Sequence, residues 1–329
     1  MRRLLVPALV GLVALLVPGA ARAQVRYLDP IFSQIQSTKD IVYGKSVNYL
    51  GQSQDLKLDL YEPVGDEEEE RAVFIWAHGG FFTQGDKSGI GIISDHMTQR
   101  GWVTISVNYR LNPTLPQGAG YVPAGDLNAA LGGFKAIHDA QHDVQAAVRW
   151  VRAHASTYRL DPDRIALGGH SAGATTSMTV AYNSDDPGNS GNPGYSSRVT
   201  AAIGTGTANA PFLDVHPDPG VEPPTAMYHG DEDSIPFLLP QSLCLIAQAM
   251  LNICQFHLYA GEGHHSRVGL NDWLAFLYPY VIGGRQSPVR VPLGTLPTLP
   301  GVPVPPPGSI PIEPIPLPLP PEVVDLLPL

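Results

Sequence analysis

The chain has few charged residues and no cluster of positive ones. Of its 329 residues, 15% are Asp, Glu, Lys or Arg, and the formal net charge is −10. A groove that follows the phosphates of a nucleic acid needs clustered Lys and Arg, so the composition argues against nucleic acid as a partner. Internal repeats are also absent. Apolar runs alternate with turn residues across the middle of the chain, which argues against a disordered chain and a polytopic membrane protein.

No apolar run is long enough for a stable membrane span. The run Leu4–Pro18 has about 15 residues, whereas a transmembrane helix needs about 20. Arg2 and Arg3 precede it, and Ala21-Arg22-Ala23 places small residues where a signal peptidase cleaves. We therefore expect residues 1–23 to be a signal peptide cleaved after Ala23, rather than an anchor, and the mature protein to be secreted or periplasmic.

Cysteine is scarce. The two cysteines, Cys244 and Cys254, are ten residues apart, and a disulfide is the ordinary state of such a pair in an exported protein. One helix running through both would hold their Cα atoms about 15 Å apart, which is too far for a bridge. A disulfide therefore requires the helix to end near Leu251–Ile253, and whether the bridge forms stays open.

Proline is unevenly distributed. Residues 287–329 hold 15 of the 33 prolines and only four charged residues. Such a segment forms neither helix nor central strand and favours extended polyproline II. It is either a spacer or docking strip for a cell-envelope partner, or an unstructured tail without one. The remaining residues, 24–286, suit one large domain.

Short apolar runs in this region alternate with helical patterns. The strand candidates are Leu56–Tyr61, Val73–Ala77, Val103–Asn108, Ile165–Gly168, Ala201–Gly204, Thr225–Tyr228 and Gln255–Tyr259. The clearest helix runs from about Ile137 to Tyr158. This alternation predicts an α/β domain with a mostly parallel sheet and helices on both faces. The long connections Asn112–Lys135 and Asn183–Val221 are expected above the carboxyl ends of the strands, where open sheets bind ligands.

One pentapeptide carries the strongest chemical signal. Gly169-His170-Ser171-Ala172-Gly173 has the pattern G-x-S-x-G, directly after one strand candidate and before a helical stretch. A serine hydroxyl is a poor nucleophile, so it must stand on a sharp turn within reach of a base, and the glycines permit that turn. The pentapeptide alone is weak evidence, but its strand–turn–helix context makes Ser171 a candidate nucleophile.

Two further motifs supply the partners that such a serine needs. His78-Gly79-Gly80-Phe81 follows the strand candidate Val73–Ala77, and its glycines expose N–H groups to a developing oxyanion. His229-Gly230-Asp231-Glu232-Asp233 and Gly261-Glu262-Gly263-His264-His265 follow two late strands. The chain order Ser171, Asp233, His264 is that of an α/β-hydrolase triad.

At these motifs the sequence resembles the α/β-hydrolase superfamily, and most closely its secreted carboxylesterases of the hormone-sensitive-lipase and feruloyl-esterase-like groups. The resemblance spans roughly Leu56–Leu277. It also includes Val107–Leu111 and Asp143–Ala155, and His78, Gly79, Gly169 and Gly173 support it as motif residues. It implies a mostly parallel sheet of about eight strands.

The resemblance also implies roles. Ser171 attacks an ester carbonyl, His264 transfers the proton, Asp233 orients the imidazole, and the N–H groups of Gly80, Phe81 and Ala172 bind the oxyanion. Asp231 and His265 compete for the acid and base roles, but the family spacing favours Asp233 and His264. Phe81 stands where the family has a third glycine, so its side chain is expected to crowd or line the acyl pocket. No metal and no organic cofactor is required.

The function expected from these motifs is that of an exported carboxylesterase acting on a small-molecule or polymer-borne ester, with short or aromatic acyl groups. Phe81 and Phe82 suggest an apolar acyl pocket, and no long apolar lid helix is visible. Two alternatives remain: a peptidase or amidase of the same fold, and a catalytically silent scaffold that binds through the Pro-rich tail. The natural ester and the oligomeric state are not predicted.

Overall fold

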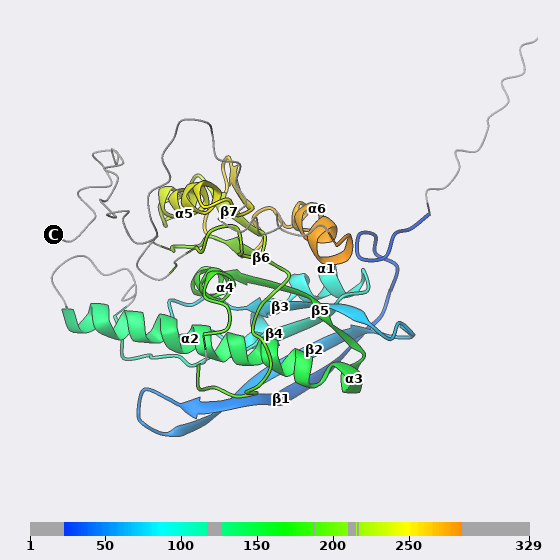
Figure 1. The fold of residues 1–329 in the computed structure, drawn as a ribbon, viewed down its shortest axis with the longest axis horizontal. Coiled ribbons are helices and arrows are strands. Elements are labelled where there is room, and N and C mark those ends of the chain that lie inside the picture. The colour runs from blue at the N-terminus through cyan, green and yellow to red at the C-terminus, as the bar shows by residue number, and fades with distance from the viewer. Residues whose placement is uncertain (1–22, 117–126, 187, 210–214, 216, 285–329) are drawn as a thin grey trace, which may run out of the picture.

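The computed structural model describes residues 23–116, 127–186, 188–209, 215 and 217–284, with the backbone alone for residues 127–131 (Figure 1). The expected signal peptide, apart from Ala23, and the Pro-rich tail 287–329 lie outside the described residues. Both therefore stay predictions, as does the domain boundary at residue 286. In the described part of the chain, every helix is too short or too polar to cross a bilayer.

A single eight-stranded sheet forms the centre of the molecule. Its strand order is β1-β2-β4-β3-β5-β6-β7-β8. β1 pairs with β2, and β2 with β4, in antiparallel fashion, whereas every other neighbouring pair is parallel. The strands are β1 (Ile35–Val47), β2 (Ser53–Pro63), β3 (Arg71–Ala77), β4 (Val103–Val107), β5 (Leu160–His170), β6 (Ala201–Thr205), β7 (Thr225–Gly230) and β8 (Cys254–Tyr259).

This sheet confirms the predicted fold class, a mostly parallel α/β sheet of eight strands. All seven strand candidates fall on observed strands, and only β1 was missed. The predicted helix from Ile137 to Tyr158 is two helices, α2 (Leu127–Ala153) and α3 (Ala155–Tyr158). The two predicted long connections are shorter than expected, because α2 begins inside the first and β6 crosses the second.

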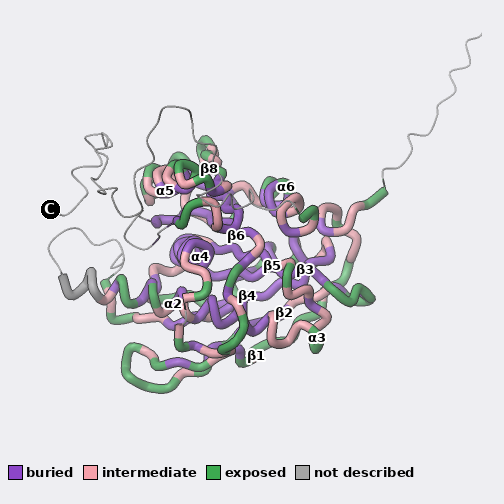
Figure 2. Tube along the Cα trace, in the orientation of Figure 1, coloured by how far each residue is buried: buried purple, intermediate pink, exposed green. Residues whose placement is uncertain are grey.

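Helices cover both faces of the sheet, as the alternation along β3 requires. Val73, Ile75 and Ala77 pack into one core with α2, α4 (Ala172–Tyr182) and α5 (Leu238–Ala249). The intervening residues Ala72, Phe74 and Trp76 pack into a second core with α1 (Ile92–Thr98) and α6 (Trp273–Leu277). Successive side chains of a strand point to opposite faces, so a strand buried on both faces is apolar throughout. Figure 2 shows the central strands buried and the outer part of the β1–β2 hairpin exposed. A short helix η1 (Lys87–Ile90) and a π-helical turn η3 (Tyr278–Ile282) complete the described elements.

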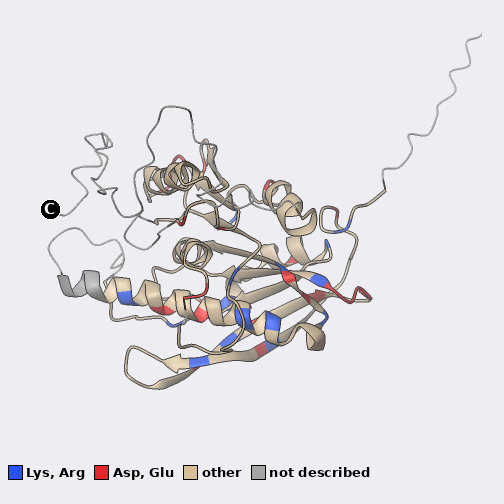
Figure 3. Cartoon of the chain, in the orientation of Figure 1, with Lys and Arg blue, Asp and Glu red and all other residues tan. Residues whose placement is uncertain are grey.

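Charged residues lie mainly on α2 and on the β1–β2–β3 side of the molecule (Figure 3), whereas α4, α5 and α6 carry no Asp, Glu, Lys or Arg. The acidic run 66–70 forms the turn between β2 and β3. Glu67–Glu70 are exposed, but Asp66 is buried and accepts two hydrogen bonds from the guanidinium of Arg26, at 2.9 and 2.6 Å. The run is therefore a solvated turn with one buried carboxylate that anchors the N-terminal segment.

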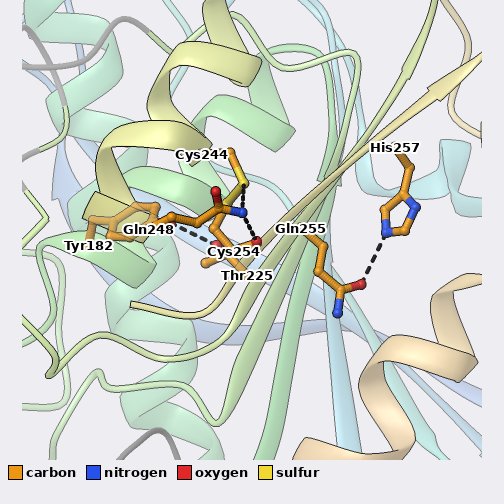
Figure 4. Close-up of a disulfide and its surroundings, with 7 residues drawn as sticks. All are labelled: Tyr182, Thr225, Cys244, Gln248, Cys254, Gln255 and His257. Carbon is orange, nitrogen blue, oxygen red and sulfur yellow. Dashed lines mark hydrogen bonds between the residues drawn. A yellow bond between two sulfur atoms is a disulfide. The ribbon is translucent and has the colours of Figure 1, made fainter. Parts of the chain in front are cut away.

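Cys244 and Cys254 form a disulfide that joins α5 to the first residue of β8 (Figure 4). The helix ends at Ala249, and Leu251 adopts a left-handed φ of 63°, so the chain turns back and the Cα atoms of the two cysteines lie 5.4 Å apart. Gln248 adds a second link, because its Nε2 donates to the carbonyl oxygen of Cys254 at 2.8 Å.

Candidate active site

Ser171 occupies a strained turn between the central strand β5 and α4. Its φ is 53° and its ψ −120°, a backbone conformation that residues with a side chain seldom adopt and that is concentrated at functional sites. The flanking glycines are required by space. A Cβ at Gly169 would lie 2.2 Å from the carbonyl oxygen of Gly173, and one at Gly173 would lie 2.1 Å from that of Ala77. The turn therefore holds the serine at the carboxyl end of the sheet.

The structure brings one acid and one histidine together. Nδ1 of His264 lies 2.8 Å from Oδ2 of Asp233, whose side chain is 1% exposed. The two competitors make other contacts. Asp231 accepts a hydrogen bond from the N–H of Gly261 at 2.7 Å, and Nε2 of His265 lies 2.5 Å from a carboxylate oxygen of Glu262. Of the four candidates, only Asp233 and His264 form an acid–histidine pair across the ends of β7 and β8.

Asp233 is held in its charged form. Burial alone would raise the pKa of its carboxyl, but hydrogen bonds from His264 and from the N–H of Ile235 hold that pKa below its usual range. His229 supports the same loop, because its Nε2 donates to the carbonyl oxygen of Ile235 at 2.8 Å. An ionised carboxylate on Nδ1–H leaves Nε2 of His264 free to accept a proton.

The serine turn and the acid–histidine pair meet at the end of β6. The N–H of Ser171 donates to the carbonyl oxygen of Thr205 at 2.9 Å. The next residue, Gly206, lies beside the pair, since a Cβ there would be 2.8 Å from Nδ1 of His264 and 3.1 Å from Oδ2 of Asp233. The ring of His170, adjacent to Ser171, lies 4.6 Å from that of His264 between centroids. Sequence reasoning missed Thr205 and Gly206, which stand in no motif, and His170, which fills the variable second position of the G-x-S-x-G motif.

The glycine-rich loop after β3 contains consecutive residues with positive φ. Gly80 has a φ of 124°, and a Cβ there would lie 2.0 Å from the carbonyl oxygen of Gln84. Phe81 has a φ of 57°, a left-handed conformation in place of the missing third glycine. In the described part of the chain, no main-chain acceptor takes the N–H of Gly80 or Phe81. Ala172 begins α4, where N–H groups have no acceptor within the helix.

Side-chain contacts fix this loop to the residues that follow β4. Asn108 donates to Asp86 at 2.7 Å and accepts from the N–H of Lys87 at 2.6 Å. Burial would raise the pKa of Asp86, but hydrogen bonds from Ser88 and Asn108 lower it to about 2. His78 stacks on Tyr109 at 4.5 Å between ring centroids, and burial lowers the pKa of its imidazole. These contacts hold the loop on both sides of Gly79 and Gly80.

Phe82 does not match the expected acyl pocket. Its side chain is 1% exposed and packs in the core, 6.2 Å from the ring of Tyr109 between centroids. Phe81, the preceding residue, also has a positive φ, but it is only half-buried. Phe81 is therefore the one of the two that offers surface to a substrate.

The motif segments Val107–Leu111 and Asp143–Ala155 contact each other through Arg110 and Asp143. Arg110, just after β4, donates from Nη2 to Asp143 of α2 at 2.8 Å, and its main-chain N–H donates to the same carboxylate at 2.7 Å. Asp143 is 0% exposed, and burial raises the pKa of its carboxyl while Arg110 opposes the rise. The pair fixes α2 against the sheet.

Among the described residues, no group of three or more His, Cys, Asp or Glu is arranged to hold a metal.

Known proteins match both the sequence and the fold. Residues 32–186 match the carboxylesterase family. The probable carboxylic ester hydrolase LipM of Mycobacterium tuberculosis is 30% identical over 172 residues, which cover 50% of this chain and 34% of that protein. The esterase LipQ of the same organism is 30% identical over 181 residues, which cover 54% of this chain and 35% of that protein. The chain thus spans about a third of the length of these curated relatives.

A solved structure adds the fold over most of the chain. Thermogutta terrifontis esterase 2, phosphoramylated by tabun, is 20% identical with a TM-score of 0.58, and the match covers 77% of this chain and 97% of that one. This likeness concerns the fold, and it does not separate the hormone-sensitive-lipase group from the feruloyl-esterase-like group, so the subgroup stays a prediction. The chain has the α/β-hydrolase fold, and its residues 32–186 match the carboxylesterase family.

Proposed function

We propose that the protein is a serine carboxylesterase. The observation that carries the proposal is the meeting of three groups at the end of β6: the strained Ser171 turn, the base candidate His264, and Asp233, 2.8 Å from its Nδ1. Two relatives are named as a probable carboxylic ester hydrolase and an esterase, which supports an ester rather than an amide as the substrate of this chain.

The mechanism follows from the positions of these groups. Oγ of Ser171 attacks the ester carbonyl carbon and passes its proton to Nε2 of His264, whose imidazolium is stabilised by Asp233 through Nδ1–H. The negative charge that develops on the carbonyl oxygen is taken by the N–H groups of Gly80, Phe81 and Ala172. His264 then gives the proton to the leaving alcohol, and the acyl group stays on Ser171. In the second half of the reaction His264 takes a proton from water, the water oxygen attacks the acyl carbon, and the proton returns to Oγ of Ser171 as the acid leaves.

The substrate is proposed to carry a short acyl group. Phe81 supplies one of the proposed oxyanion N–H groups and is half-buried, so we expect its side chain to limit the space for an acyl chain. Structures of Thermogutta terrifontis esterase 2 with butyrate and with propionate bound support the same acyl class. Export is proposed as well, because the Cys244–Cys254 disulfide fits an oxidising compartment. The tail's envelope contact remains a prediction about residues outside the described part.

Two matched pairs of variants test the assignment of roles. The full chain is assayed on p-nitrophenyl esters from C2 to C16 and on aminoacyl p-nitroanilides. Asp233→Asn and His264→Gln should each lower kcat by about a thousandfold or more, whereas Asp231→Asn and His265→Gln should stay within about tenfold of the wild type.

Four results of the same assay would contradict these proposals. Equal losses within either pair would remove the assigned acid or base. A higher kcat/KM on C12–C16 than on C2–C6 esters would refute the short-acyl proposal. Faster turnover of the anilides than of the esters would make the protein an amidase, and no Ser171-dependent turnover of either by folded protein would leave a silent scaffold.

A further inference from the structure

His170 is the last residue of β5 and immediately precedes Ser171. Its ring lies against that of His264, with centroids 4.6 Å apart and planes tilted by 41°. Asp233 holds His264 by one hydrogen bond at Nδ1. A single hydrogen bond at one ring atom leaves the imidazole able to swing about that bond, so a second contact is needed to set the direction of Nε2.

The end of β6 fixes the orientation of His170. Nδ1 of His170 lies 3.2 Å from the carbonyl oxygen of Thr205 and 3.3 Å from its Oγ1. A carbonyl oxygen only accepts, so Nδ1 carries the hydrogen and Nε2 carries the lone pair in the neutral ring. Oγ1 of Thr205 in turn donates to the carbonyl oxygen of Gly169 at 3.3 Å. The tautomer of His170 is thus set by the same residue that accepts the N–H of Ser171.

The charge state of His170 matters to its neighbour. Burial, and then the proximity of His264, lower the pKa of His170 to about 4. The charged or titratable groups around it are His264 and His265 after β8 and Asp233 after β7. Because His170 stays neutral, it fills the space beside His264 without repelling the imidazolium that forms when Ser171 gives up its proton.

We propose that His170 is a positioning residue that sets the ring of His264 toward Ser171, itself oriented by Thr205 at the end of β6. This proposal rests on the function proposed above. His170 contacts no reacting atom, and its effect passes through the histidine that does.

The first test removes the ring. His170→Ala loses both the ring contact and the hydrogen bond to Thr205, whereas His170→Asn keeps a donor near the place of Nδ1 and loses only the ring. On p-nitrophenyl butyrate, kcat per folded molecule should fall about tenfold or more in His170→Ala and less in His170→Asn, with KM within about twofold. A residue that only supports the fold would change the yield of folded protein and leave kcat per folded molecule unchanged.

The second test changes the charge, and one of its two readouts, the NMR titration, does not require turnover. In His170→Asp, a carboxylate beside His264 stabilises the imidazolium, so the pKa of His264 rises and the acid limb of the kcat/KM profile moves to higher pH. We expect a rise of about half a unit or more in that pKa, followed by NMR of histidine-labelled protein. His138→Asp, an exposed histidine on α2, makes the same change of charge and should leave that pKa unmoved.

The two readouts separate this proposal from the proposed function. An unchanged kcat per folded molecule in His170→Ala, or an equal His264 pKa in the wild type and His170→Asp, overturns the positioning role. Should His170→Ala fail to fold, the kcat of His170→Asn decides in its place. Should the wild type hydrolyse no ester, the proposed function fails, and the NMR titration alone decides whether His170 acts on His264.

Discussion

Gly206 follows β6 with a φ of 59°, and a Cβ at this position would lie 2.8 Å from Nδ1 of His264. Gly206→Ala should therefore push the imidazole away from Asp233 and lower kcat by about ten- to a hundredfold. Gly220 has a similar φ of 65° with no atom within 4 Å of an added Cβ. Gly220→Ala shares the left-handed strain of about 1 kcal/mol and should keep full kcat. Steady-state kinetics of the two folded variants makes the comparison, and equal kcat values would show that the space at Gly206 is not used.

Residues of the site differ in how far the sequence could reveal them. Ser171, Asp233 and His264 stand in motifs whose spacing reflects a strand followed by a tight turn, and all three were predicted from the sequence. Thr205 and Gly206 act through a carbonyl oxygen and a missing side chain at the end of a strand. Neither feature leaves a residue pattern, because many residues supply a carbonyl and most glycines serve turns. Only the register that pairs His170 with Thr205 reveals the contact.

At the scale of elements, β1 is the strand that the sequence concealed. Its 13 residues, Ile35–Val47, are mostly exposed, and only Tyr43 and Ser46 are buried. An antiparallel edge strand needs neither a continuous apolar run nor strict alternation, and irregular pairing after Thr38 and Val42 disturbs what alternation there is. Six of the seven strands that were found contain runs of buried residues, whereas in β8, at the opposite edge of the sheet, only Cys254 is buried.

The disulfide is the covalent link between α5 and β8, and the loop that it closes is ten residues long. Closing a loop of this length stabilises a protein by about 2–3 kcal/mol through the unfolded state. Replacing both cysteines by alanine, Cys244→Ala with Cys254→Ala, should lower the free energy of unfolding by about that amount. Urea denaturation at pH 7 measures it, and an unchanged midpoint would show that the packing of α5 and the Gln248 contact suffice without the bridge.

At the scale of the whole molecule, buried titratable groups couple stability to pH in opposite directions. Burial lowers the pKa of His96 to about 4, so between about pH 6.5 and 4 the unfolded chain binds the extra proton and acid destabilises the fold. Burial raises the pKa of Glu222 to about 7, so between about pH 4.5 and 7 the folded chain binds the proton and acid stabilises it.

Urea unfolding of the wild type and two variants at pH 7.5 and 5.0 tests this balance. On acidification, His96→Gln should lose less unfolding free energy than the wild type, because the group through which acid destabilises the fold is gone. Glu222→Gln should lose more, because the group through which acid stabilises the fold is gone. Parallel pH dependence in all three proteins would mean that neither group titrates differently in the folded and unfolded states.

Ser171, in its strained turn, is the proposed nucleophile, and covalent capture by an organophosphate would identify the nucleophile without relying on kinetics. The full chain and Ser171→Ala are incubated with paraoxon, and the intact mass and the modified peptide are determined by mass spectrometry. We expect one phosphoryl adduct in the wild type, located at Ser171, with parallel loss of ester hydrolysis, and no adduct in Ser171→Ala. An adduct at another residue, or ester hydrolysis that survives in Ser171→Ala, would contradict it.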